Sequence, residues 1–235
     1  MKTLYKKLLE DVRLKEGLNA CFNCGTCTAI CPAAEFYNYD PRQVIDTVQS
    51  KDDSKILELL KGETIWYCGE CMSCKTRCPR SNAPGLVIIA LRALSIKTGN
   101  FIESEKGRQL LALKRTIGDT ILKYGYCVHI DEMTTEMHPE QGPIWDWYRN
   151  NRKAVLDRLG GNYGQEGAGI LRKISNQNLD ELQKIFDVTG ATEQFNYIEE
   201  CSRKKALELK LEFSSGQDEY FNHVYEVNNM NHHKI

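Results

Sequence analysis

Two short runs of cysteine constrain the fold of this 235-residue chain more than any other feature of its sequence. Each run holds four cysteines and ends at a proline, with the spacing C-x2-C-x2-C-x3-C-P. The first run spans residues 21–31 and the second spans residues 68–78, so together they contain eight of the ten cysteines. Thiols at this density either pair as disulfides or bind metal, and the surrounding chain must fold to support them.

The rest of the sequence indicates which of these two roles applies. The longest apolar stretch, residues 84–96, is too short to span a bilayer and contains Arg92. The N-terminus leads into an amphipathic pattern and lacks the apolar core of a signal peptide. We therefore expect a cytoplasmic protein without membrane insertion. In a reducing compartment clustered thiols more often bind metal than form disulfides.

The spacing within each run is typical of a site for a cubane [4Fe–4S] cluster. Two residues between cysteines let one turn bring three thiolates to three corners of a cube, and the same turn exposes backbone N–H groups to the cluster sulfurs. Zinc sites usually use two C-x2-C pairs a dozen or more residues apart, or cysteine with histidine. No histidine lies near either run. We predict two [4Fe–4S] clusters, with a pair of structural zinc sites as the alternative.

In runs of this type the fourth cysteine ligates the other cluster. The exchange ties the two halves of the site together and places the clusters near one another. The predicted ligands are Cys21, Cys24, Cys27 and Cys78 for the first cluster, and Cys68, Cys71, Cys74 and Cys31 for the second.

Charge and composition narrow the function further. The formal net charge is -1, which argues against bulk binding to nucleic acid or to an anionic membrane surface. The sequence contains no Ser-His-Asp arrangement, no pair of catalytic carboxylates and no phosphate loop. We therefore expect no catalytic residues on this chain by itself, and no bond-making chemistry without a partner.

Helical signals surround both runs and predict an all-α fold. In the 36-residue spacer, Asp40 with Pro41 marks one helix start and Ser54 marks another. After the second run, Pro84 opens an apolar helix that ends near Gly99. These signals predict an α-helical ferredoxin domain over residues 1–100 that carries two [4Fe–4S] clusters.

The rest of the chain predicts a mostly helical C-terminal extension over 101–213 for subunit docking, and a poorly ordered or partner-dependent tail over 214–235. Helical periodicity covers 101–122 and 144–159, and Asn178 and Thr192 mark two later helix starts. Five glycines between residues 160 and 169 predict a flexible loop, because they match no nucleotide-binding motif. Cys127 and Cys201 have no neighbouring ligands, and we expect both to be small buried hydrophobic residues.

The segment from Trp66 to Arg80, followed by an apolar helix with Arg92, resembles the C subunit of heterodisulfide reductase. So does the segment from Cys21 to Pro32 ahead of a helical spacer of this length. More broadly, the sequence is similar to the α-helical ferredoxin module of succinate dehydrogenase and fumarate reductase iron–sulfur subunits. Those subunits also carry a [2Fe–2S] run with C-x4-C-x2-C spacing, which is absent here. The resemblance covers about 100 of the 235 residues.

The resemblance implies an electron-transfer subunit of a hetero-oligomeric complex. Its implied partners are an A subunit with FAD and iron–sulfur clusters, and a B subunit whose cysteine-rich CCG domains carry disulfide or sulfur chemistry. The long extension is similar to C subunits of the heterodisulfide reductase-like complexes of sulfur-oxidising bacteria and archaea. Three alternatives stay open: an iron–sulfur subunit of a glycerol 3-phosphate, lactate or glycolate dehydrogenase, a free ferredoxin-like carrier, and a redox or metal sensor.

Overall fold

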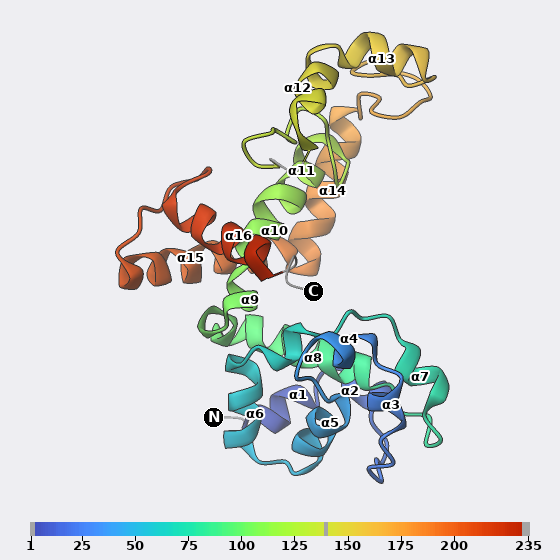
Figure 1. Ribbon diagram of the computed structural model, residues 1–235, viewed down its shortest axis with the longest axis vertical. Helices are drawn as coiled ribbons and strands as arrows, with labels where there is room; N and C mark the ends of the chain where they lie inside the picture. The colour runs from blue at the N-terminus through green and yellow to red at the C-terminus, as the bar shows by residue number, and fades with distance from the viewer. Residues whose placement is uncertain (1–2, 139–140, 232–235) are drawn as a thin grey trace.

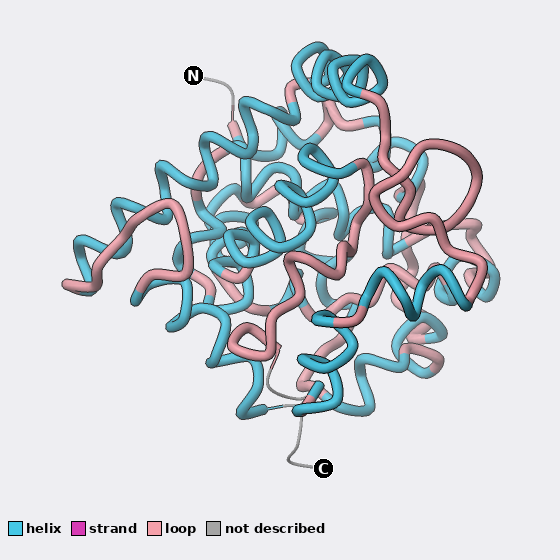
Figure 2. The backbone as a smooth tube through the Cα atoms, turned by 90° about the horizontal axis from the view of Figure 1, so that it is seen from above, coloured by secondary structure: helices cyan, strands magenta, loops and turns pink. Residues whose placement is uncertain are grey.

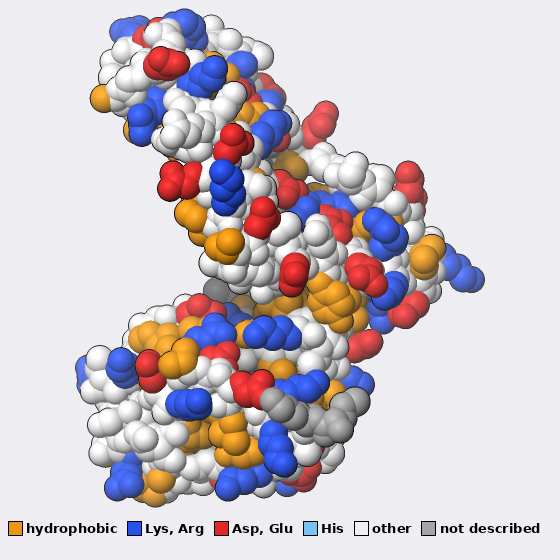
Figure 3. Space-filling view, turned by 180° about the vertical axis from the view of Figure 1, so that it is seen from behind, with side chains coloured by type: hydrophobic (Ala, Val, Ile, Leu, Met, Phe, Trp, Pro, Cys, Tyr) orange, Lys and Arg blue, Asp and Glu red, His pale blue; other side chains and the backbone are white. Residues whose placement is uncertain are grey.

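A computed structural model describes residues 3–138 and 141–231 of the chain. Every regular element within these residues is helical, which confirms the predicted all-α class (Figure 2). The helices form two lobes that meet at a narrow waist (Figures 1 and 3). No helix in the described part of the chain is both long enough and apolar enough to cross a membrane.

The first lobe contains both cysteine runs. Its elements in chain order are α1 (Leu4–Leu8), α2 (Val12–Gly17), α3 (Thr26–Ala29), α4 (Pro32–Phe36), α5 (Pro41–Gln49), α6 (Asp53–Lys61), the 3-10 turn η1 (Thr64–Trp66), α7 (Ser73–Arg77) and α8 (Pro84–Lys97). The Asp40 carboxylate caps α5 through the backbone N–H of Arg42 at 2.9 Å, as the sequence predicts. The cap of α6 is Asp52 and not Ser54, so this helix begins earlier than predicted.

The core of the first lobe forms where α5 and α6 pack on α8. Helix α8 is apolar around its whole circumference, because it lies beneath the other helices of the lobe. Helix α2 approaches α8 so closely that a Cβ on Gly17 would lie 3.0 Å from the Ala83 carbonyl oxygen. Each large aliphatic side chain buried in this core contributes about 1.5–3 kcal/mol. The fully buried members include Val48, Ile56, Leu60, Ile65, Val87, Ile88 and Leu91.

The second lobe is longer and more open. Its elements are η2 (Asn100–Glu103), α9 (Glu105–Arg108), α10 (Leu110–Leu113), the π-helical turn η3 (Lys114–Gly118), α11 (Asp119–Tyr124), α12 (Pro143–Asn150), α13 (Arg152–Arg158), α14 (Asn176–Thr189), α15 (Ala191–Leu209) and α16 (Glu219–Asn231). The helices predicted over 101–122 and 144–159 are therefore present but interrupted. Helix α14 is capped by Ser175, and not by Asn178 as predicted. The end that carries α12 and α13 lies farthest from the cysteine runs (Figure 1).

A second core joins α10, α15 and α16 to the end of α8. Tyr220 and Phe221 of α16 are buried, so this part of the segment predicted as a poorly ordered or partner-dependent tail packs against the second lobe. Residues 232–235 lie outside the described residues. Trp66 contacts both cores, and α8 contributes Leu94 to the first and Ile96 to the second. Helix α8 therefore belongs to the cores of both lobes.

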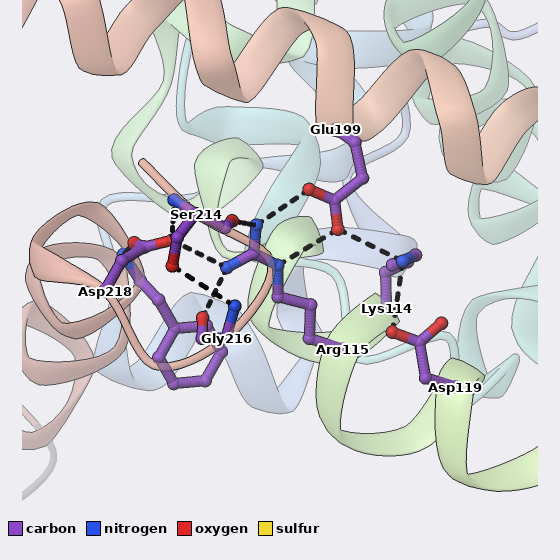
Figure 4. Close-up of polar contacts among 8 residues, drawn as sticks. Lys114, Arg115, Asp119, Glu199, Ser214, Gly216 and Asp218 are labelled. Atoms are coloured by element: carbon purple, nitrogen blue, oxygen red, sulfur yellow. Dashed lines mark hydrogen bonds and ion pairs between the residues drawn. The ribbon is translucent and has the colours of Figure 1, made fainter. Parts of the chain in front are cut away.

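A buried guanidinium fixes the second core (Figure 4). Arg115 on η3 has a side chain only 7% exposed, and it forms ion pairs with Glu199 at 2.8 Å and with Asp218 at 3.0 Å. It also donates hydrogen bonds to the carbonyl oxygens of Ser214 and Gly216. Burial opposes ionisation of Glu199, but the hydrogen bonds from Arg115 and from the neighbouring lysine lower its pKa overall. One side chain thus holds η3, α15 and the start of α16 together.

The substitution Arg115→Met removes this cation and leaves the buried carboxylate of Asp218 without its ion-pair partner, while Glu199 keeps only its pair with Lys114. We expect the free energy of unfolding to fall by about 3–5 kcal/mol, the usual cost of breaking a buried ion pair. Urea unfolding of the wild type and the variant measures the change. The control is Lys204→Met, which removes a solvent-exposed pair with Glu200 and leaves the urea midpoint unchanged. Equal midpoints for Arg115→Met and the wild type would contradict the expectation.

Candidate iron–sulfur centres

The two cysteine runs adopt the same local backbone conformation. In each run the residue before the second cysteine has a positive φ, 61° at Asn23 and 55° at Glu70. The residue after that cysteine also has a positive φ, 79° at Gly25 and 58° at Met72. Turns of this kind direct backbone N–H groups into a shared concavity that favours anions. The two runs, which have the same cysteine spacing, therefore also form the same backbone turn around their second cysteine.

Backbone amides point at sulfur in both runs. The N–H of Asn23 donates to the Sγ of Cys21 at 3.4 Å, and the N–H of Glu70 donates to the Sγ of Cys68 at 3.4 Å. These contacts match the prediction that the turn offers amide donors to the sulfur atoms. They stabilise negative charge on the first cysteine of each run.

The second cysteine of each run lies at the surface beside a hydroxyl. The Sγ of Cys24 is 3.3 Å from the hydroxyl of Thr26, and the Sγ of Cys71 is 3.4 Å from the hydroxyl of Ser73. These side-chain hydrogen bonds lower the pKa of both thiols. Both cysteines are exposed, so each run presents one thiolate-forming sulfur to solvent.

The third cysteine of each run lies inward. Cys27 and Cys74 are carried by α3 and α7, which pack against each other. Burial raises the pKa of both thiols. The charge of Cys21 and, more weakly, that of Cys74 adds to the effect on Cys27, which shows that the two runs face one another. Thiols in this position ionise readily only when a cation or a metal compensates the charge.

One cavity gathers the complete set of ligands predicted for the second cluster. Its wall contains three cysteines of the second run and the last cysteine of the first run, namely Cys68, Cys71, Cys74 and Cys31. The cavity volume is about 30 Å³, and Tyr39 and Ile88 also line it. For the first set, the structure places Cys27 beside Cys21 and carries Cys24 and Cys78 next to α3 and α7, which pack together.

The cavity wall combines cysteine sulfur with a buried hydroxyl, while no three His, Cys, Asp or Glu side chains among the described residues stand close enough together to hold a single metal ion. The hydroxyl of Tyr39 is buried and makes no hydrogen bond of ordinary geometry in the described structure, although the sulfur of Cys68 lies close enough to act on it as an acceptor. Burial, and then the nearby charge of Cys68, raise the pKa of this phenol. A buried donor without an acceptor costs free energy, unless a bound group supplies one. Four thiols and one buried hydroxyl around a small cavity fit a cofactor that is rich in sulfur acceptors.

Side chains from the helices fix the backbone of each run. Gln49 accepts a hydrogen bond from the N–H of Cys21 at 2.8 Å. Arg92 donates to the carbonyl oxygen of Cys68 at 2.6 Å, and it forms an ion pair with Glu70. The spacing of the cysteines does not predict these two contacts, because Gln49 lies 28 positions from Cys21 and Arg92 lies 24 positions from Cys68.

Asn82 connects the chain after the second run to the chain before the first. Its side chain is buried, accepts from the N–H of Asn19 at 2.8 Å and donates to the carbonyl oxygen of Ala20 at 3.3 Å. The N–H of the adjacent Ala83 donates to the carbonyl oxygen of Gly17 at 2.8 Å. The two runs are therefore held in register from both ends.

The two isolated cysteines differ from one another. Cys201 is buried in the second core, as predicted. Cys127 is exposed, so the prediction that it is a buried hydrophobic residue is wrong. It lies in the bend that follows α11, two residues after the C-cap Gly125.

Residues 17–82 match the family model described as a 4Fe-4S dicluster domain. The match begins at the residue that contacts α8 and ends at the asparagine that closes the site, so it contains both cysteine runs. The chain thus carries a 4Fe-4S dicluster domain.

Curated relatives identify the family. The chain is 31% identical over 208 residues to the C subunit of the ferredoxin:CoB-CoM heterodisulfide reductase of Methanosarcina acetivorans, an alignment that covers 88% of this chain and 76% of the relative. It is 30% identical over 199 residues to the C subunit of the H(2):CoB-CoM heterodisulfide,ferredoxin reductase of Methanothermobacter marburgensis, with 82% of this chain and 86% of the relative covered. The chain belongs to the family of heterodisulfide reductase C subunits.

The extent of these matches changes two expectations. The likeness covers most of the chain and not only its first 100 residues, so it includes much of the second lobe. The long extension does not favour the complexes of sulfur oxidisers either. The Methanosarcina acetivorans relative is longer than this chain, because the same alignment covers a smaller share of it.

The substitution Asn82→Ala tests the connection between the two runs. It removes two part-buried hydrogen bonds, to Asn19 and to Ala20, so we expect the free energy of unfolding to fall by about 1–3 kcal/mol, the usual contribution of two hydrogen bonds. Anaerobic denaturant titration of the purified protein measures the change. Asn38→Ala, at an exposed position of the same lobe, is the matched control and leaves the midpoint unchanged. A variant Asn82→Ala as stable as the control would show that the connection is dispensable.

Proposed function

We propose that this chain relays single electrons between partner subunits through two [4Fe–4S] clusters. The proposed ligands are Cys21, Cys24, Cys27 and Cys78 for one cluster, and Cys68, Cys71, Cys74 and Cys31 for the other. The observation that carries the proposal is the cavity lined by three cysteines of one run and the last cysteine of the other. This is the ligand exchange that the spacing of the runs predicts.

When bound, the clusters supply one-electron chemistry, and the residues of the chain set where and how easily it occurs. Amide donors from Asn23 and Glu70 offset negative charge on sulfur. Gln49 and Arg92 keep the ligand backbone still, so little reorganisation accompanies a change of charge. The exposed second cysteines bring ligand sulfur to the surface, where a partner can approach within electron-transfer distance.

The partners that we propose are an A subunit with FAD and iron–sulfur clusters and a B subunit with CCG domains. In this arrangement B carries the disulfide or sulfur chemistry. We propose residues 1–100 as the ferredoxin domain and 101–213 as the extension that docks a partner. The exposed apolar face of α12 supports a docking role, because Ile144 is 70% exposed and Trp147, one turn later, is 56% exposed.

The substitutions Cys24→Ser and Cys71→Ser test the ligand sets separately. The wild-type chain should contain about eight iron and eight sulfide per chain, and each variant should lose about half of both. Anaerobic metal and sulfide analysis with EPR of the reduced protein measures the loss, and the two variants should lose different signals. Cys127→Ser is the control and keeps the full content. Zinc in the wild type, or full iron in Cys24→Ser, would overturn the assignment.

The double substitution Ile144→Glu and Trp147→Glu tests the docking role of the extension. Two carboxylates on this face disfavour burial against a partner, so co-purification of the other subunits should fall at least tenfold. Iron content should not change, because α12 lies far from the cysteine runs (Figure 1). Val12→Glu, at an exposed apolar position of the first lobe, is the control. Unchanged recovery of the complex would show that α12 is not part of an interface.

A further inference from the structure

The spacing of the cysteines does not explain the buried hydroxyl of Tyr39. This hydroxyl lies in the cavity that contains the cysteines proposed for the second cluster. The side chain of Tyr39 is only 4% exposed, and it lines the cavity beside Cys31, Cys68 and Cys74. Its hydroxyl makes no hydrogen bond of ordinary geometry in the described structure, and the sulfur of Cys68 lies close enough to act on it as an acceptor. Among the neighbouring ionisable groups, Cys68 acts on it most strongly. The hydroxyl therefore faces cysteine sulfur and whatever the four cysteines bind.

Packing holds the ring of Tyr39 in this position. Its ring lies edge-on to the ring of Tyr67, with centroids 6.3 Å apart and planes at 75°. Its backbone N–H donates to the carbonyl oxygen of Tyr37 at 2.7 Å, and the next residue, Asp40, caps α5. The aromatic body thus belongs to the first core, and only its polar end faces the cavity.

We propose that the hydroxyl of Tyr39 donates a hydrogen bond to sulfur at the second iron–sulfur centre and thereby raises the reduction potential of that centre. The inference rests on the proposed function, because it requires a cluster in the cavity. It assigns a positioning and tuning role to a residue that is not itself a ligand.

The direction of the effect follows from charge. A phenol is protonated at neutral pH and is therefore a donor. When the centre accepts one electron, its sulfur atoms become more negative, and a hydrogen bond to them becomes stronger. The donor thus stabilises the reduced form more than the oxidised form, which raises the potential.

The first centre lacks this donor at the position equivalent by spacing. Tyr39 lies eight residues after the last cysteine of the first run, and Leu86 lies eight residues after the last cysteine of the second run. The two runs share the same turns and amide contacts. Of these two equivalent positions only Tyr39 carries a hydroxyl, and a buried phenol at one of them is a means to give two similar clusters different potentials.

The test is Tyr39→Phe, which keeps the ring and removes only the hydroxyl. EPR-monitored redox titration of the anaerobic, cluster-loaded full-length protein should show the second centre harder to reduce by about tenfold, the size of one hydrogen bond. For one electron this is a shift of about 59 mV to lower potential. The signal that changes in Cys71→Ser identifies the second centre. Tyr37→Phe, two residues away and outside the cavity lining, should shift neither centre.

A second measurement separates the hydrogen bond from a merely structural role. After exchange into deuterated water, hyperfine spectroscopy of the reduced wild type should detect an exchangeable deuteron coupled to the second centre, and Tyr39→Phe should lose it. Two intact clusters with unchanged potentials in Tyr39→Phe would overturn this inference alone. A wild type that binds no iron–sulfur cluster would instead overturn the proposed function.

Discussion

The hydrogen bonds of Asn82 are the constraint on which the cysteine site depends. They join the chain just before the first run to the chain just after the second, across 63 residues. Eight thiols on two separate turns can share two centres only if both turns keep a fixed distance and orientation. The contact between Gly17 and Ala83 closes the same loop through the backbone. Because these bonds involve no cysteine, the polypeptide supplies part of the order that a bound cluster would otherwise have to impose.

Helix α8 carries this order from the cysteine site to the rest of the chain. Its Arg92 holds the carbonyl of Cys68, while Leu94 and Ile96, two residues apart, belong to different cores. Trp66, just ahead of the second run, also contacts both cores. A displacement of the second lobe must therefore move a helix that contacts the turn of the second cysteine run. This arrangement couples the position of the second lobe to the backbone of that run.

The sequence predicts those features that depend on local spacing. The two runs form equal turns because their residues are equally spaced, and Asp40 with Pro41 starts a helix because capping needs only neighbouring amides. Contacts that depend on tertiary structure could not be predicted. Tyr39 and Gln49 lie in the spacer, and no periodicity distinguishes them from ordinary core and surface residues. Helix α16 was missed for the same reason, because its anchor is a guanidinium 103 residues away from Asp218.

The two runs differ in their surroundings although their backbones are alike. Beside the second run, Lys75, Arg77 and Arg80 are exposed, and the cavity behind it contains a buried hydroxyl. The first run instead carries the exposed aromatic ring of Phe22 between two of its cysteines. Positive charge and hydrogen-bond donors favour the reduced state of a nearby cluster, whereas an apolar rim does not. Two centres with equal ligands but unequal surroundings would therefore differ in reduction potential, and the potentials of the partners that donate and accept the electrons would set the direction of flow.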